Sequence, residues 1–207
     1  MALLEEDEYL VKQEEKIEDS AEYILTNKGQ IACQLKETHC LVFAQLIEDK
    51  RLDDLTSKQL VALFSCFTNI SVQEDFKDYT CEGIDDVPVK TLLKDILKMY
   101  EEYQQREINY KINSGIDYNM HYDLLVYVNE WCDASSAEEC KLVLQNLSQE
   151  KEVFLGEFVK ALLKINNISC EMEKIAEMTG NIALLSKLRE IPQMTLKYVV
   201  TNQSLYV

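Results

Sequence analysis

Glycine and proline are scarce in this sequence, with only 5 and 2 of them among 207 residues. All-β folds need many such residues for their turns, so the scarcity argues against a turn-rich β-sandwich or barrel and favours helices. No apolar run approaches the roughly 18 residues that span a bilayer, and the first residues are acidic where a secretory signal is basic. We therefore expect a mainly α-helical, intracellular protein without a membrane contact.

Patterns for catalysis and metal binding are also missing. The 7 cysteines form no C-x-x-C pair, and their odd number indicates reduced thiols rather than a disulfide framework. The pairs His39 with Cys40 and Cys132 with Cys140 match none of the usual zinc spacings. Three cysteines are expected to be small core residues: Cys33, Cys66 and Cys170. We expect no catalytic residue, metal site or cofactor in this chain.

Charge is distributed unevenly along the chain. The net charge is −16, yet residues 151–207 hold seven basic and six acidic groups, so the first 150 residues carry −17. Within that stretch, residues 1–22 contain nine acids against two lysines, which indicates an acidic leader that is helical or frayed. Phosphate binding relies on Lys and Arg, so only the last quarter of the chain is suited to nucleic acid.

The periodicity of the chain predicts one small hairpin followed by helices. Two extended segments, Tyr23–Thr26 and Ile31–Leu35, flank the turn-like Asn27–Gln30. Residues 72–87 show no sustained period and indicate a loop or a single helical turn. Thr38 is expected to cap a helix that ends near Asp49, and Thr56 with Gln59 forms a capping box for a helix that ends near Phe67. Further helices are expected at Val89–Ile112, Tyr118–Cys132, Ala137–Leu147 and Leu155–Cys170, then one ended by Gly180 and one begun by Pro192. The expected fold is a bundle of about seven to nine helices with a small N-terminal β-hairpin.

A polar stripe lies on the helix expected at Leu155–Cys170. Lys160, Lys164 and Asn167 follow one another at spacings of three and four, with Glu157 and Glu171 on the same stripe. By periodicity alone, such a stripe is most often a solvated face with internal Glu–Lys pairs. Its two lysines are nevertheless the best placed cations of the chain for a phosphate backbone.

Six blocks of the sequence resemble, in order, the DSHCT domain, the C-terminal module of superkiller-like DExH-box RNA helicases. The resemblance runs from about Lys28 to the end and rests on Lys28–Cys33, Leu55–Phe67, Tyr127–Trp131, Gly156–Lys160, Ile175–Asn181 and Ser204–Val207. It implies one helical domain over residues 23–207, with the hairpin at residues 23–35. Such a domain packs on two ATP-binding RecA-like domains and lies beneath the path of single-stranded RNA, which these helicases move 3′ to 5′ into exosome-type processing or decay.

The helicase motor itself is missing from this sequence. It has no GxxxxGK[ST] phosphate loop and no Asp-Glu-x-His box, the motifs that supply the phosphate cradle and the magnesium site of ATP hydrolysis. The resemblance therefore implies that ATP and Mg belong to RecA-like domains of a longer helicase. This chain would be an accessory part of that enzyme and would not be catalytic by itself.

The resemblance also assigns candidate RNA-binding residues. It places the RNA-facing helix at Leu155–Asn167, with Lys160 and Lys164 at the basic positions and Asn167 beside them. Glu74 could approach the same path, although the correspondence there is loose. Arginine is usual at the basic positions, and lysine lacks its forked hydrogen bonding, so contacts to the RNA backbone are expected more than contacts to bases.

Two other classes of function remain open. An acidic helical protein-interaction module would use the first half of the chain against a basic partner, without RNA. A self-contained enzyme is the least supported, because the only histidines are His39 and His121 and neither stands in a recognisable nucleophile–base pattern.

Overall fold

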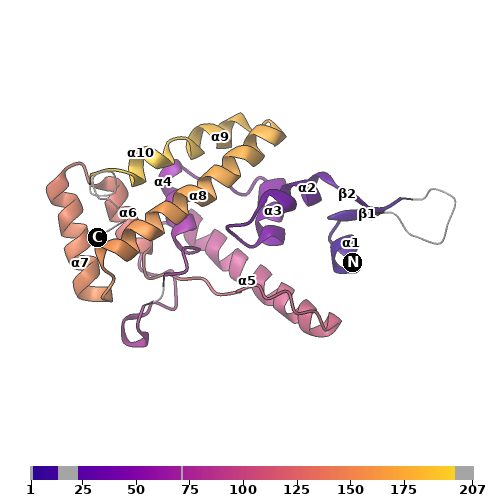
Figure 1. The fold of residues 1–207 in the computed structure, drawn as a ribbon, viewed down its shortest axis with the longest axis horizontal. Helices are drawn as coiled ribbons and strands as arrows, with labels where there is room; N and C mark the ends of the chain where they lie inside the picture. Colours follow the sequence, from indigo (N-terminus) through magenta and orange to yellow (C-terminus); the bar gives the residue numbers. More distant parts are fainter. Residues whose placement is uncertain (1, 14–22, 71, 199–207) are drawn as a thin grey trace.

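The fold is a bundle of helices with one small hairpin near the N-terminus (Figure 1). The computed structural model describes residues 2–13, 23–70 and 72–198. The strands are β1 (Leu10–Lys12) and β2 (Tyr23–Leu25), and the helices are α1 (Ala2–Glu6), α2 (Asn27–Gln34), α3 (Cys40–Glu48), α4 (Ser57–Ser65), the 3-10 turn η1 (Glu74–Phe76), α5 (Val87–Tyr110), α6 (Leu125–Asp133), α7 (Ala137–Lys151), α8 (Leu155–Thr179), α9 (Ile182–Leu188) and α10 (Ile191–Thr195). The predicted mainly α fold with an N-terminal hairpin is confirmed.

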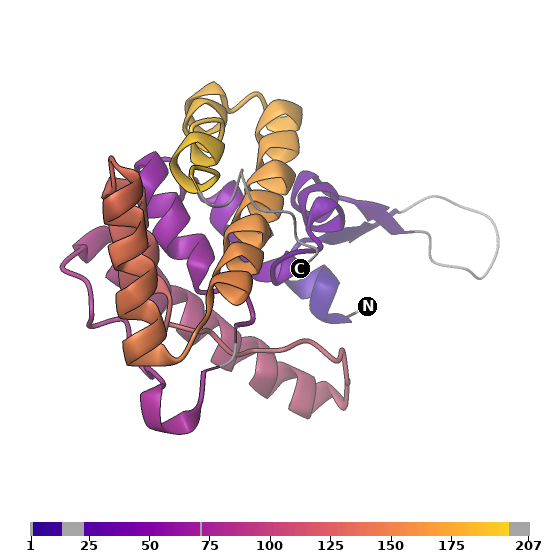
Figure 2. The ribbon, with the colours of Figure 1, turned by 60° about the vertical axis from the view of Figure 1, so that its left-hand side comes forward.

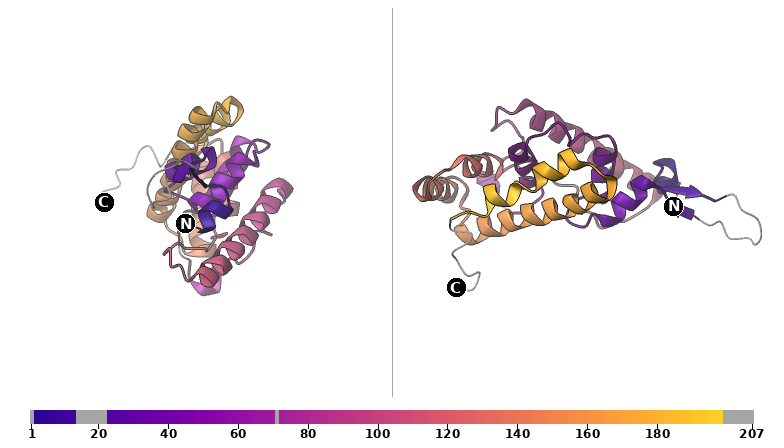
Figure 3. Two further views of the ribbon diagram at one scale, coloured as in Figure 1. Left: turned by 90° about the vertical axis from the view of Figure 1, so that its right-hand side faces the viewer. Right: turned by 90° about the horizontal axis from the view of Figure 1, so that it is seen from above.

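Helix α8 runs along most of the length of the bundle (Figures 1 and 3). The hairpin lies beyond one end of α8 and α6 and α7 lie near the other, while α9 and α10 fold back along it. Figure 2 shows the hairpin standing away from the helices. Among the described helices, none is both long and apolar enough to cross a bilayer.

The hairpin differs from the expected one in its second strand. β2 pairs antiparallel with β1, with Val11 opposite Ile24, and not with residues 31–35. The expected turn at residues 27–30 and most of the expected second strand at residues 31–35 form helix α2 instead. Short apolar runs are ambiguous between strand and helix, and here the choice depends on a partner strand that precedes Tyr23 in the chain.

Local contacts explain why α2 is helical. The Thr26 side chain caps the helix by accepting a hydrogen bond from the Gly29 backbone N–H at 3.0 Å. Gly29 is needed for close approach and not for a turn, because a Cβ there would lie 2.2 Å from the Tyr9 carbonyl oxygen. The Thr26 amide donates to the same oxygen at 3.1 Å, so Tyr9, at the start of the hairpin, is fastened to the start of α2.

The described part of the acidic leader packs on the bundle. Leu3 of α1 and Tyr9 belong to the buried core, and the Tyr9 hydroxyl donates to the Leu41 carbonyl at 2.7 Å. Arg106 of α5 donates to both carboxylate oxygens of Asp7, at 2.8 and 2.7 Å. Residues 14–22 of the predicted leader lie outside the described residues, and so does the terminal block Ser204–Val207.

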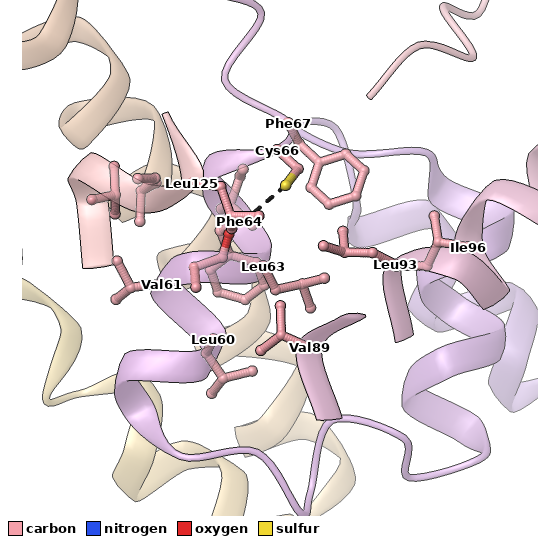
Figure 4. Close-up of a cluster of buried hydrophobic side chains, with 14 of the residues drawn as sticks. Leu60, Val61, Leu63, Phe64, Cys66, Phe67, Val89, Leu93, Ile96 and Leu125 are labelled. Atoms are coloured by element: carbon pink, nitrogen blue, oxygen red, sulfur yellow. Dashed lines mark hydrogen bonds between the residues drawn. The ribbon is translucent and has the colours of Figure 1, made fainter. Parts of the chain in front are cut away.

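Helix α4 lies in the middle of the core. The predicted capping box is present: the Gln59 backbone N–H donates to the Thr56 hydroxyl, and the Gln59 side chain accepts from the Thr56 N–H. Figure 4 shows buried side chains of α4 and of the two residues after it, together with those that meet them from α5 and α6: Leu60, Val61, Leu63, Phe64, Cys66, Phe67, Val89, Leu93, Ile96 and Leu125. Cys66 is buried as predicted, but Cys33 and Cys170 are exposed, so their expected core role was wrong.

The helix expected from Tyr118 begins at Leu125 instead. Residues before it make tertiary contacts that a helix would break: the His121 amide donates to the Cys66 carbonyl at 3.0 Å, and the buried carboxylate of Asp123 accepts from the Asp78 amide at 2.6 Å. Helix α3 likewise begins one residue later than expected, because His39 and not Thr38 is its N-cap.

Candidate functional site

Three of the four candidate RNA-binding residues, Lys160, Lys164 and Asn167, lie on α8, which is a single helix of 25 residues. Two helices were expected here, one of them ending at Cys170, but no helix breaker stands between Cys170 and Gly180. The Glu157 carboxylate accepts from the Phe154 amide at the first turn, and Gly180 ends the helix in the left-handed conformation. The predicted candidates are therefore carried by a rigid element anchored at both ends.

One face of α8 is buried against the rest of the bundle. Its buried apolar residues include Phe158, Leu162, Ile165 and Ile168, each fully shielded from solvent. Asn166, next to the candidate Asn167, points inward and donates from Nδ2 to the Leu162 carbonyl at 2.7 Å and to the Thr195 hydroxyl at 2.8 Å. The side chain of Asn166 therefore serves the attachment of α10.

The opposite face of α8 carries the polar stripe predicted from the sequence. Lys160 and Asn167 are both exposed, and within the described residues no ion pair or side-chain hydrogen bond engages either of them. Lys164, one turn from Lys160, is partly buried and forms an ion pair with Glu37.

Glu37 belongs to a short turn between α2 and α3 that is bound to the stripe at a second point. The Glu171 carboxylate accepts from the backbone amides of Lys36 and Glu37, at 2.9 and 3.0 Å. Lys164 and Glu171 thus fasten this turn to α8 from two positions seven residues apart. In this structure Lys164 has a structural contact, and an RNA phosphate would have to compete with Glu37 for it.

One further lysine joins the stripe because α8 continues beyond Cys170. Lys174 is exposed, and within the described part of the chain it makes no ion pair. It lies 14 residues after Lys160, or about 21 Å along the axis. Lys174 was not predicted as a candidate because the helix was expected to end at Cys170. Its spacing of seven residues from Asn167 would have placed it on the same helical face.

Glu74 lies away from this stripe, in η1. Its carboxylate accepts from the Tyr79 hydroxyl and the Lys77 ammonium, and the hydrogen bond from Tyr79 is the main reason that the pKa of Glu74 is lowered. Lys151 holds the same loop at the junction of α7 and α8 through the Phe76 carbonyl at 2.6 Å. Within the described residues, no hydrogen bond or ion pair connects Glu74 to the stripe, and its RNA role stays a prediction.

Titratable groups elsewhere are mostly structural. Burial raises the pKa of the Cys132 thiol to about 11, which keeps it protonated and unreactive. In the described part of the chain, no group of three or more His, Cys, Asp or Glu side chains could hold a metal ion.

Comparison with known proteins identifies relatives of this domain. The model of the DSHCT (NUC185) domain matches residues 22–202. The ATP-dependent RNA helicase mtr4 of Schizosaccharomyces pombe is 23% identical over 89% of this chain, and the Exosome RNA helicase MTR4 of Mus musculus is also 23% identical over 89%. The DExH-box ATP-dependent RNA helicase DExH10 of Arabidopsis thaliana is 20% identical over 90%. The chain spans only 16–18% of the length of these three relatives.

Proposed function

Because the chain belongs to the DSHCT (NUC185) domain family, we propose that it is the accessory helical domain of an ATP-dependent RNA helicase and positions single-stranded RNA for the motor. The relatives it matches are RNA helicases of which it spans a small part, which supports an accessory role. The motor would be two RecA-like domains of a longer chain, which would hold ATP and Mg and move the strand 3′ to 5′. One matched relative bears the name exosome RNA helicase, so exosome-type factors are proposed partners, and the proposed location is intracellular.

The polar stripe of α8 supports the RNA contact. Lys160 and Lys174 are exposed and without carboxylate partners within the described residues, so their ammonium groups are available to phosphates. Asn167 lies between them along the helix and can hydrogen-bond a ribose or a base edge through its amide. The single observation that carries the proposal is this pair of exposed cations, unpaired within the described residues, on one face of a rigid helix.

The charge of the remaining chain favours the same face. The first 150 residues carry −17, so most of the surface repels a polyanion, whereas residues 151–207 carry +1. RNA would therefore approach through α8. The alternative is an acidic interaction module that binds a basic partner through the charge of −17 on the first 150 residues. That alternative gives the exposed lysines of the stripe no role.

The test measures the affinity of this chain for single-stranded RNA at several salt concentrations after Lys160→Ala and Lys174→Ala are combined. Each phosphate contact contributes about 0.7 to the slope of log affinity against log salt for single strands, so the double variant should lose about 1.4 in slope. Lys141→Ala is the matched control, because Lys141 is also exposed and unpaired within the described residues but lies on α7. An unchanged slope in the double variant, or an equal loss in the control, would sink the assignment.

A further inference from the structure

A polar cavity of about 340 Å³ opens beside Lys164. It lies where the turn between α2 and α3 meets Tyr100 of α5 and the loop that follows α5. Thr38 and His39 line it from the turn, and Asp117 and Asn119 line it from the loop. None of these four residues has a part in the contacts of the polar stripe described above.

The side chain of His39 has a donor without a partner. Its Nδ1 accepts a hydrogen bond from the Val42 backbone N–H at 3.3 Å, so Nδ1 carries no proton. Burial lowers the pKa of His39 to about 4, so the ring is neutral near pH 7 and its one proton is on Nε2. That Nε2 is buried, and within the described residues it has no hydrogen-bond partner. A buried unpaired donor is costly unless a ligand satisfies it.

Thr38 adds a second unsatisfied group to the same cavity. Its hydroxyl oxygen is buried and has no hydrogen-bond partner within the described part of the chain. Two adjacent residues that line the cavity thus carry buried polar atoms without a partner in the described part of the chain. Buried polar groups in proteins are usually paired with protein, water or a ligand, so these two call for such a partner.

The remaining walls suit a flat, neutral ligand with polar edges. The buried ring of Tyr100 lies 5.3 Å from that of His39, centroid to centroid, and gives the cavity an aromatic wall. Charged side chains at the rim balance, since Lys36 and Lys164 are matched by Glu37 and Asp117. Aromatic faces and hydrogen-bonding groups are what proteins use to hold unstacked RNA bases.

We propose that this cavity receives one unstacked nucleobase of the single-stranded RNA that follows α8, with the Nε2–H of His39 and the hydroxyl of Thr38 bound to the edge of the base. The inference rests on the proposed function. Lys164 lines the cavity and lies one helical turn from Lys160, so a strand held by the stripe passes the cavity. The site would make the domain sensitive to bases and not to phosphates alone.

The experiment compares the affinity of this chain for a short oligouridylate and for an abasic strand of the same length and charge. Two variants remove the polar groups, Thr38→Val with little change in shape and His39→Asn with loss of the imidazole ring that packs on Tyr100. Thr38→Val deletes the hydroxyl, and His39→Asn keeps a favoured N-cap residue for α3 while it deletes the Nε2–H. Thr91→Val is the control, because Thr91 is an exposed hydroxyl on α5 that contacts only its own helix.

The wild-type chain should prefer the strand with bases, and each cavity variant should reduce that preference about fivefold, the effect of one lost hydrogen bond. The Lys160→Ala and Lys174→Ala double variant should instead weaken both strands equally. Equal binding of the two strands, or a preference that survives both cavity variants in folded protein, overturns the cavity and leaves the lysine stripe intact. Failure of both strands to bind overturns the proposed function itself.

Discussion

Gly29→Ala gives the sharpest test of how the hairpin is attached to the bundle. In the interior of an exposed helix, this change normally stabilises a protein by up to about 1 kcal/mol, because glycine is a poor helix former. At Gly29 the added Cβ would lie 2.2 Å from the Tyr9 carbonyl oxygen and 2.9 Å from Leu25 Cδ2. The first of these atoms is backbone, so it cannot rotate away.

The structure therefore predicts that Gly29→Ala lowers the free energy of unfolding instead of raising it. To accommodate the methyl group, Tyr9 must move away from α2, which lengthens the bonds that its carbonyl accepts from the Thr26 amide and hydroxyl, at 3.1 and 3.2 Å. Overpacking of this kind costs roughly 1–3 kcal/mol, which exceeds the gain in helix propensity. Subtracting the gain from the middle of this range, we expect a net loss of about 1 kcal/mol in the free energy of unfolding, or about 2–4 °C in Tm for a chain of this size.

Urea unfolding followed by far-UV circular dichroism and by the fluorescence of Trp131 measures the effect. Trp131 is the single tryptophan and is fully buried against Phe158, so its emission reports loss of the core. Gly156→Ala is the matched control: it is also a helical glycine, but a Cβ there meets nothing within 4 Å. A Gly29→Ala chain as stable as the wild type, or stabilised like the control, would refute the close approach of Tyr9 to α2.

Two further predictions concern the helix caps. Thr56→Ala removes the acceptor of the α4 capping box and should lower the free energy of unfolding by about 1 kcal/mol, with Thr56→Ser as the control that restores it; equal stability of all three chains in urea would contradict the cap. Burial lowers the pKa of His39 to about 4 in the folded chain, whereas the unfolded group titrates near 6.5. Its contribution to stability is therefore complete above about pH 6.5. As the pH drops to 4, the free energy of unfolding should fall by about 3 kcal/mol. Parallel unfolding in the wild type and His39→Asn should show a smaller loss in the variant over that range; identical pH profiles would show that His39 is not buried as described.

Local signals predicted the parts of the fold that depend on neighbouring residues. Thr56 with Gln59 identified a capping box, and Gly180 and Pro192 marked the end of α8 and the start of α10, because caps and breakers act within a few residues. Gly29 was predicted to belong to a turn, but it permits the close approach of the distant Tyr9 backbone, and sequence alone does not distinguish these two roles. The partner of β2 precedes it at Leu10–Lys12 and carries no local mark of that pairing.

The candidate site was also predictable only where it depends on neighbouring residues. Helical spacing predicted the polar stripe, and the exposed side chains of Lys160 and Asn167 agree with it. The ion pair of Lys164 could not be predicted from the sequence, because its partner Glu37 lies 127 residues earlier in the chain. The cavity beside Lys164 is assembled from α2–α3, α5 and the following loop, and no single segment of sequence describes it.

The unbroken length of α8 has a mechanical consequence. A helix of 25 residues is about 37 Å long, and a tilt of about 5° at one end moves the other end by about 3 Å. A break near Cys170 would have created a hinge and absorbed such a tilt. Without one, a tilt of α8 would move the turn that carries Lys160 together with the helices packed along its buried face.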